Sequence, residues 1–342
     1  MNSKRFIPVL VTALALCSCA KAVSVSTGEK AREYLSLWME EFHPGVEPQE
    51  SGLYILEDVP GTGAAWNGGL AYTSVGVTIR QLGGTISSTT DEKLAKQLGT
   101  YSKANYYGPK WVQTGEGYSY AGVDALLEGM RQGGSRTAVV PAWMLTTSRY
   151  STQAEYIAAC SSSTSLIYTI TMDRQVSDID QEEKRLVDSY VHTHFGPSEP
   201  ARSYDGEEAD GTFYFVSDST AFIGTPMHPT DTTLTLNYTG MRLDGQIFDT
   251  TIERVARDAG IYSNSRTYEP VSITCSSTWS NIQLDGSSSL VNGFKGGLYL
   301  MKYDGQKATI IFTSSHGYQT SGSGDVIPAW CPLRFDLEFV EQ

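Results

Sequence analysis

Two stretches of the chain carry apolar residues at the three- and four-residue spacing of an amphipathic helix. The first covers residues 31–42, with Thr27 as a suitable cap, and it ends at a His-Pro-Gly sequence. The second covers residues 186–195 and ends at Gly-Pro. An apolar face that can pack, closed by residues that stop a helix, predicts a helix in both places.

The segments that follow these two helices repeat one order of features. After each helix come an acidic loop with Pro and Gly and then a strand of alternating polarity, GLYILEDV and GTFYFVSD. Further on, GVDALLEGMRQGGSRTAVVP and GFKGGLYLMKYDGQKATIIF each combine a short helix, a glycine turn, a basic residue and a buried strand. Each half closes on an alternating strand, at 165–172 and 332–339. A repeat of this length predicts two homologous domains, with their boundary near residues 176–180.

The fold class follows from the elements within each half. Strands rich in Thr, Val, Ile and Tyr surround one short helix that precedes the last strands. This order is typical of an α+β domain in which a bent antiparallel β-sheet wraps on a short helix. The amphipathic helix in front of each half is an addition to that plan.

Composition and charge limit the class of protein. The 342 residues are 40% apolar, enough for real cores, and the net charge is −13 with a pI near 4.8. Such an acidic chain is repelled by nucleic acid and by anionic lipid, so neither is expected as a partner. His192 and His194 are two residues apart on a predicted helix and cannot share a face, so no metal site is expected, and no cofactor motif is present.

The N-terminal 19 residues are predicted to be a lipoprotein signal peptide rather than a buried helix. A short basic segment is followed by an apolar run and then by LCSC, which resembles a bacterial lipoprotein box. In that box Cys19 is the residue that receives the lipid, since Cys17 follows a bulky leucine. The chain is therefore expected to be exported and held by lipid on the periplasmic side of a bacterial membrane.

Three cysteines remain once the signal peptide and Cys19 are set aside. They are Cys160, Cys275 and Cys331, an odd number in a compartment that permits disulfides. Cys275 and Cys331 are candidates for a disulfide bond, and Cys160 is then expected to be a buried thiol.

The stretch NYTGMRLDGQIFDTT resembles the FKBP-type peptidyl-prolyl cis–trans isomerases, whose sequences read YTG, then DG, then FD. Four later blocks keep the family's order: LVNGFKGGLYLM, DGQKATIIF, HGYQTSGSGDVIP and LRFDLEF. The resemblance runs from Thr232 to the end of the chain. It implies that residues 177–342 form an isomerase domain, and that residues 20–176 form a second, degenerate domain of the same fold.

The resemblance also implies a set of site residues. The backbone N–H of Val291 and the hydroxyl of Tyr318 are expected to donate to the substrate, and Arg254 to pair with Asp249. His316 stands where the family often has a second aromatic residue of the flap, and Phe294 replaces a tryptophan of the pocket floor. The implied pocket consists of Tyr238, Phe248, Asp249, Val291, Phe294, Tyr318 and Phe335, and the implied accessory substrate contacts are Leu290, Arg254, Ile327 and His316.

This set suits the chemistry of proline isomerisation. Rotation about an X–Pro bond crosses a barrier of about 18–20 kcal/mol because amide resonance is lost. A catalyst of this step needs no nucleophile. It needs a dry apolar pocket for the proline ring and hydrogen-bond donors placed for the turned carbonyl.

Two departures from the family pattern stand out. The connection from Thr251 to Leu290 is long; it is expected to shape substrate choice or to cover the cleft, with Tyr268 as a candidate pocket aromatic. The first half places Ile86 and Ser87 where the second has its phenylalanine and aspartate.

At the other pocket positions the first half has Tyr120 for Val291 and Thr146 for Tyr318, and it keeps only Tyr168 as the counterpart of Phe335. It is therefore expected to be structural, dimerising or peptide-holding.

The sequence as a whole predicts an isomerase that assists the folding of exported proteins and acts on unfolded or extended proline-containing polypeptides. The alternative is a non-catalytic chaperone or peptide-binding module with the same fold. The two differ in turnover of proline peptides.

Overall fold

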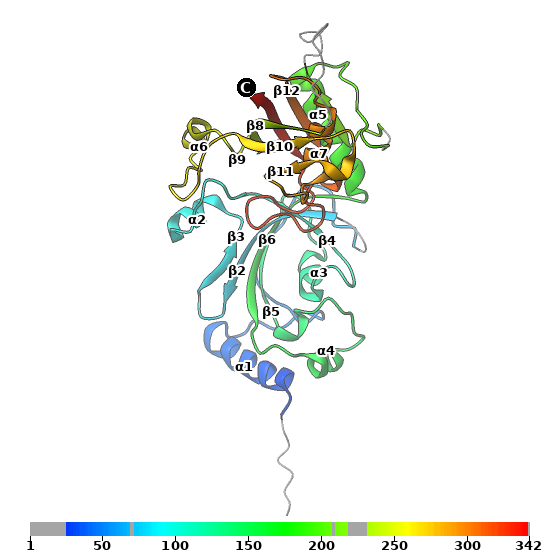
Figure 1. Cartoon of the computed structure of the whole chain (residues 1–342). Helices are drawn as coiled ribbons and strands as arrows, with labels where there is room; N and C mark the ends of the chain where they lie inside the picture. Colours follow the sequence, from blue (N-terminus) through cyan, green and yellow to red (C-terminus); the bar gives the residue numbers. More distant parts are fainter. Residues whose placement is uncertain (1–24, 69–71, 207–208, 218–230, 341–342) are drawn as a thin grey trace, which may run out of the picture.

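The computed structural model describes residues 25–68, 72–206, 209–217 and 231–340. They form two sheet-centred units that follow one another along the chain, the first in the lower part of Figure 1 and the second in the upper part. The predicted signal peptide and Cys19 lie outside the described residues. Within the described ranges, no helix has the length and apolar character needed to cross a bilayer.

The first unit contains four α-helices, six strands and a 3₁₀ turn within its described residues. In chain order they are α1 (Thr27–Phe42), β1 (Tyr54–Val59), β2 (Tyr72–Gln81), β3 (Ile86–Thr89), α2 (Glu92–Leu98), β4 (Lys110–Gln113), α3 (Ala121–Leu127), β5 (Ser135–Val140), η1 (Ala142–Met144), α4 (Gln153–Ala159) and β6 (Leu166–Val176).

The second unit repeats this order with a longer connection before its central helix, and its described residues have no counterpart of α4. Its described elements are α5 (Ile179–Phe195), β7 (Phe213–Val216), β8 (Thr232–Arg242), β9 (Ile247–Thr250), α6 (Glu253–Ala259), β10 (Val271–Cys275), η3 (Trp279–Asn281), β11 (Gln283–Leu284), α7 (Asn292–Leu300), β12 (Lys307–Phe312), η4 (Ser314–His316) and β13 (Leu333–Val340).

The two sheets have the same topology. In the first the strand order is β1-β5-β6-β2, and both β3 and β4 pair with β2. In the second it is β7-β12-β13-β8, and both β9 and β10 pair with β8, with β11 added at the edge. All the strand pairs are antiparallel. The duplication and the α+β class predicted from the sequence are confirmed.

Each sheet packs on its short helix through a glycine. A Cβ added at Gly122 of α3 would lie 2.3 Å from the Val140 side chain, and one added at Gly293 of α7 would lie 2.4 Å from the Phe312 ring. Val140 and Phe312 are the last residues of β5 and β12. The close approach of helix and strand therefore requires glycine at the same place in both units.

The added helices α1 and α5 pack differently from one another. α1 buries Ala31, Leu35 and Met39 against η1 and α4, whereas Tyr34 and Phe42 are 58% and 62% exposed. The predicted apolar face of α1 was therefore partly wrong, and its N-cap is Ser26 rather than Thr27. α5 packs Val187 and Val191 against the second sheet, as predicted.

The cysteine prediction is wrong in two respects. Cys160, Cys275 and Cys331 are all free thiols. Cys275 lies in the core on β10, whereas Cys160 is half-exposed and its sulfur lies 3.0 Å from the Ser162 carbonyl oxygen.

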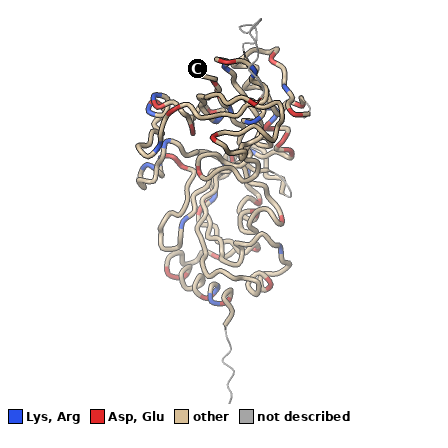
Figure 2. The backbone as a smooth tube through the Cα atoms, in the orientation of Figure 1, with Lys and Arg blue, Asp and Glu red and all other residues tan. Residues whose placement is uncertain are grey.

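Figure 2 shows acidic and basic residues interspersed over both units, so the net negative charge is not gathered on one of them.

Candidate functional site

Phe335 lies at the centre of a cluster of rings in the second unit. It stands in the middle of β13, and its ring centroid is 5.2 Å from Phe294 on α7 and 5.7 Å from Phe248 on β9, both edge-on. Tyr238 on β8 lies edge-on to Phe294 at 5.5 Å. Phe294 and Phe335 are each 5% exposed, while Tyr238 and Phe248 are half-buried. Four residues from distant parts of the chain, all predicted as pocket residues, thus meet in one cluster of two buried and two half-buried rings.

The absence of a side chain at Gly240 leaves space for these rings. Gly240 was not among the predicted site residues. It pairs with Phe335 across β8 and β13. A Cβ added at Gly240 would lie 2.6 Å from the Phe335 ring and 2.8 Å from the Phe248 ring. Any side chain there would displace the rings, and the glycine of the YTG motif is the signal that could have identified it.

The polar side of the cluster is a three-residue network. The Tyr238 hydroxyl donates to the Asp249 carboxylate over 2.7 Å, and the Arg266 guanidinium contacts the same carboxylate and lies 3.4 Å from the Tyr238 hydroxyl oxygen. Burial, together with the charge of Asp249, raises the pKa of Tyr238. The hydroxyl therefore stays protonated and the carboxylate is paired, so this network positions Tyr238 and holds its proton in place.

The predicted pairing of Arg254 with Asp249 is wrong, and Arg266 takes that place. Arg254 is on α6 with its side chain 84% exposed, 3.6 Å from Asp258 one turn further along. The loop after α6 instead returns to the site, fixed by the stacked rings of Tyr262 and Tyr268 at 5.3 Å. Tyr268, the candidate pocket aromatic, has its ring 5.5 Å from the Arg266 guanidinium. It therefore contacts the arginine of the network.

Two hydrogen-bond donors that pack against the core of the ring cluster have no acceptor among the described residues. Val291 is the N-cap of α7, and its backbone N–H makes no hydrogen bond to the described part of the chain. The Tyr318 hydroxyl, just after η4, likewise bonds no described residue. Burial and the nearby Asp249 raise the pKa of Tyr318, which keeps its proton available for donation. Leu290, Val291 and Tyr318 are half-buried against the same core.

Two of the accessory residues differ in their surroundings. Ile327 is 3% exposed within residues 317–332, which we call the flap loop, and it belongs to the core that contains the ring cluster. His316 is directed away from that cluster. Its Nδ1 lies 2.5 Å from the Tyr204 hydroxyl and its Nε2 lies 2.8 Å from the Thr212 hydroxyl, so its prediction as an aromatic of the flap is wrong.

The η3 segment of the long connection packs on α7. Trp279 of η3 stacks on Tyr204 at 5.1 Å and lies edge-on to Tyr299 of α7 at 6.0 Å. Lys295, 6% exposed on α7, has its Nζ 4.9 Å from the Trp279 ring. This part of the connection therefore contacts α7, whereas Arg266 and Tyr268 of the same connection lie at the ring cluster.

The equivalent place in the first unit lacks the site residues. Register pairs Ile79 with Ser88 and Tyr168, as it pairs Gly240 with Asp249 and Phe335. The counterparts of Phe248 and Asp249 are thus Ser87 and Ser88, one residue on from the predicted Ile86 and Ser87. Ile79 puts a side chain where the second unit has only glycine. The predicted match of Tyr168 with Phe335 is confirmed.

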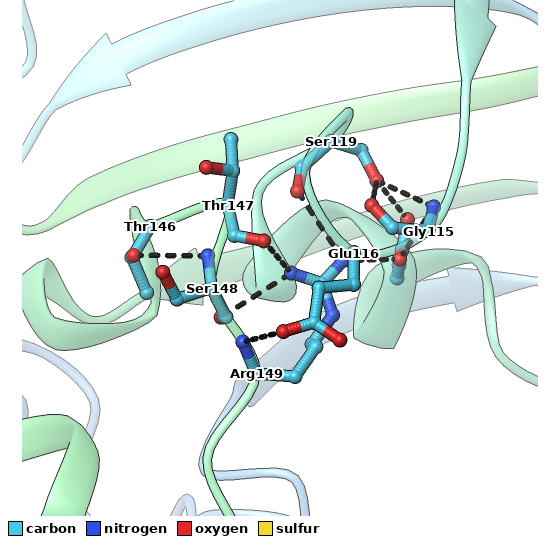
Figure 3. Close-up of polar contacts among 8 residues, drawn as sticks. Gly115, Glu116, Ser119, Thr146, Thr147, Ser148 and Arg149 are labelled. Carbon is cyan, nitrogen blue, oxygen red and sulfur yellow. Dashed lines mark hydrogen bonds and ion pairs between the residues drawn. The ribbon is translucent and has the colours of Figure 1, made fainter.

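The first unit has additional hydrogen bonds at the start of its short helix, whose N-cap is Tyr120 where that of α7 is Val291. The Ala121 amide of α3 donates to the Thr146 carbonyl over 2.8 Å, which ties the helix to the loop after η1. Arg149 donates to the carbonyls of Thr147 and Ser119 over 3.0 and 3.2 Å, as Figure 3 shows. Arg149 also pairs with Asp124 of α3 at 2.5 Å. The first unit therefore keeps the fold, and a set of polar contacts around Arg149 ties its short helix to the loop after η1.

The described residues contain no group of three or more His, Cys, Asp or Glu side chains placed to hold an ion. His192 instead lies 3.2 Å from Asp188 on the same helix, and His194 lies 2.8 Å from the Tyr190 carbonyl.

One family model and several solved structures are similar to parts of this chain. The family model described as FKBP-type peptidyl-prolyl cis-trans isomerase matches residues 225–340. A peptidyl-prolyl cis-trans isomerase from Pseudomonas syringae pv. tomato is similar in structure, with 20% identity and a TM-score of 0.29, over 47% of this chain and 92% of that one. The three FKBP domains of wheat FKBP73 are similar with 12% identity and a TM-score of 0.27, over 84% of this chain and 93% of that one. No curated protein matches the chain.

Proposed function

We propose where this chain catalyses and on what, from the premise that residues 225–340 belong to the FKBP-type peptidyl-prolyl cis–trans isomerases. The proline ring of the substrate occupies the ring cluster of the second unit, against Phe335 and Phe294 and beside Phe248. The first unit has no proline site of its own. The substrates are extended or unfolded polypeptides that contain proline.

The single observation that carries this proposal is the pair of free donors beside an apolar floor. The Val291 amide and the Tyr318 hydroxyl lack acceptors among the described residues, and the adjacent rings of Phe294 and Phe335 are 5% exposed. A buried floor favours the twisted amide because its reduced charge separation is not penalised there. The Val291 N–H donates a hydrogen bond to the carbonyl of the residue before proline, and the Tyr318 hydroxyl donates one to the second substrate carbonyl. Neither residue gains or loses a proton during the turn.

The network of Tyr238, Asp249 and Arg266 orients the site without reacting. The Asp249 carboxylate forms an ion pair with Arg266 and accepts the hydrogen bond of the Tyr238 hydroxyl. Its role is to fix the Tyr238 ring against Phe294. This mechanism predicts that turnover is insensitive to pH between about 6 and 8, since no catalytic group titrates there.

A protease-coupled assay on a proline tetrapeptide tests the proposal with the full chain. We expect acceleration of the cis-to-trans step above the thermal rate, lost in Phe248→Ala. Acceleration that survives this substitution unchanged would place the site elsewhere. A chain that binds unfolded proline-containing protein without any acceleration would favour the chaperone alternative.

We further propose that the chain works as an exported lipoprotein on the periplasmic side of the membrane, where it assists the folding of exported proteins. The support is the LCSC sequence after a basic and apolar N-terminal segment. Metabolic labelling with palmitate should mark the wild type and Cys17→Ser, and should not mark Cys19→Ser. Labelling that persists in Cys19→Ser would refute the assignment.

A further inference from the structure

The flap loop of the second unit is docked on the first unit. The Tyr106 amide, in the loop between α2 and β4, donates to the Asp325 carbonyl over 2.7 Å. The Lys110 ammonium, at the start of β4, lies 3.7 Å from the Asp325 carboxylate. A backbone bond and an ion pair therefore join one residue of the flap loop to two positions of the other unit.

A buried arginine strengthens the same junction. Arg242, the last residue of β8, is 4% exposed and donates to the Val326 carbonyl over 2.8 Å and to the Ala104 carbonyl over 3.4 Å. Its guanidinium also lies 5.1 Å from the centroid of the Tyr106 ring. Its charge is paired with Asp244, 3.2 Å from its Nε, and its remaining contacts join the flap loop to the first unit.

Trp330 links this junction to the catalytic end of the loop. Its ring lies edge-on to Tyr72 of β2 at 5.3 Å, and its backbone has a left-handed φ of 52°. Its amide donates to the Gln319 carbonyl over 2.9 Å, next to Tyr318. This bond couples the contact between Trp330 and the first unit to the backbone beside Tyr318.

The loop between α2 and β4, which holds the flap loop, has the same arrangement as the loop after α6 in the second unit. Tyr101 and Tyr107 stack at 5.4 Å, and the Ser102 amide donates to the Tyr107 hydroxyl over 3.1 Å. The second unit has the same stack, with the same bond from the Ser263 amide to Tyr268 at 3.0 Å. By this correspondence Asn105 stands where Arg266 binds Asp249. The first unit has thus kept the loop without its arginine, and the next residue, Tyr106, holds the flap.

We propose that the first unit is a positioning element for the isomerase site: it fixes the flap loop so that Tyr318 and Ile327 stay in place over the ring cluster. The proposal rests on the proposed function for the catalytic role of that loop. Residues 317–332 connect η4 to β13, and apart from a bridge between Ser323 and Ile327 they join no described strand. A loop of this kind opens easily unless it is held from outside.

The test is the double substitution Tyr72→Ala/Tyr106→Ala in the full chain, which removes the two rings of the first unit that Trp330 and Arg242 contact. We expect amide hydrogen exchange in residues 318–330 to rise by about tenfold, as the loss of two ring contacts allows. We expect KM for a proline tetrapeptide to rise by a similar factor while thermal melting of the second unit changes little.

Two matched variants separate positioning from a loss of folding. Tyr34→Ala removes a tyrosine that is 58% exposed on α1, far from the junction, and should leave both readouts unchanged. Tyr72→Phe/Tyr106→Phe keeps both rings and should restore wild-type behaviour. If the double alanine variant unfolds the first unit, Tyr72→Ala alone, which removes only the contact with Trp330, should still raise exchange at residues 318–330.

Failure of this proposal is distinguishable from failure of the proposed function. Unchanged exchange of the flap loop in the double alanine variant overturns the positioning role, whatever the enzyme's activity. Raised exchange with unchanged KM and kcat overturns it as well. An inactive wild type contradicts the proposed function, and with it the catalytic part of this inference, while the exchange measurement still decides whether the first unit holds the loop.

Discussion

Replacing Glu183 by glutamine should remove a pH dependence from the stability of the second unit. Glu183 lies on α5 and is 2% exposed, and one carboxylate oxygen accepts from the Ser314 amide over 2.8 Å. The other oxygen, Oε1, has no hydrogen-bond partner in the described chain. Burial raises the pKa of this carboxyl to about 7, and the nearby Asp180 acts in the same direction.

The sign and size follow from proton linkage. An unfolded glutamate releases its proton near its usual pKa of about 4.5, whereas the folded one keeps it until about pH 7. Between these values the native state binds more protons, so the free energy of unfolding falls as pH rises. A shift of about 2.5 units at about 1.36 kcal/mol each gives a loss of about 3 kcal/mol across the window, nearly complete by pH 8.

Urea unfolding of the full chain at several pH values, with pulsed hydrogen exchange reporting on β12, measures this slope. Glu183→Gln should flatten the curve between pH 5 and 7.5. Glu182→Gln is the matched control because the pKa of Glu182 is lowered, chiefly by its hydrogen bond from Arg185 and by Arg174. That variant should weaken the unit about equally at every pH in the window. Equal slopes for wild type and Glu183→Gln would refute the reasoning.

Three further predictions concern the site and the thiols. Gly240→Ala should destabilise the second unit by about 1–3 kcal/mol in urea unfolding, because its methyl group would crowd the Phe335 ring, whereas Gly83→Ala, with nothing within 4 Å of its Cβ, should be neutral. Arg266→Leu should lower kcat/KM for a proline tetrapeptide by about tenfold, since Asp249 loses its ion pair; Arg254→Leu should leave it unchanged, and the reverse order would contradict the network. In a chain with Cys17→Ser and Cys19→Ser, a thiol reagent should modify Cys160 quickly and the other two cysteines only on unfolding, because burial raises the pKa of Cys275 and of Cys331 to about 12; fewer than three thiols after unfolding would indicate a disulfide.

The sequence was sufficient for the duplicated fold because the same order of helix, turn and strand recurs in both halves. The ring cluster was also predictable, since Tyr238, Phe248, Phe294 and Phe335 sit in ordered motifs. Arg266 was not, because it reaches Asp249 only through a loop shaped by stacked tyrosines, while Arg254 is nearer in sequence and faces solvent.

Other errors have the same origin in tertiary structure. The first unit has no aromatic residue at the position of Phe248, so nothing in its sequence fixed the register that the strand pairing reveals. His316 neighbours the flap in sequence, but η4 turns its ring toward Tyr204 and Thr212. The docking of the flap loop on the first unit joins segments more than 200 residues apart and leaves no local pattern.

The central claim is that catalysis belongs to the ring cluster of the second unit and is absent from the first. Two double variants of the full chain test it most directly when the rate of cis–trans interconversion of a proline peptide is measured. Phe248→Ala/Tyr318→Phe should reduce the rate to the thermal value, because it removes one wall of the pocket and one donor. Ser87→Ala/Thr146→Ala changes the equivalent positions of the first unit and should retain wild-type turnover. Loss of turnover in the second variant with survival in the first would contradict the account.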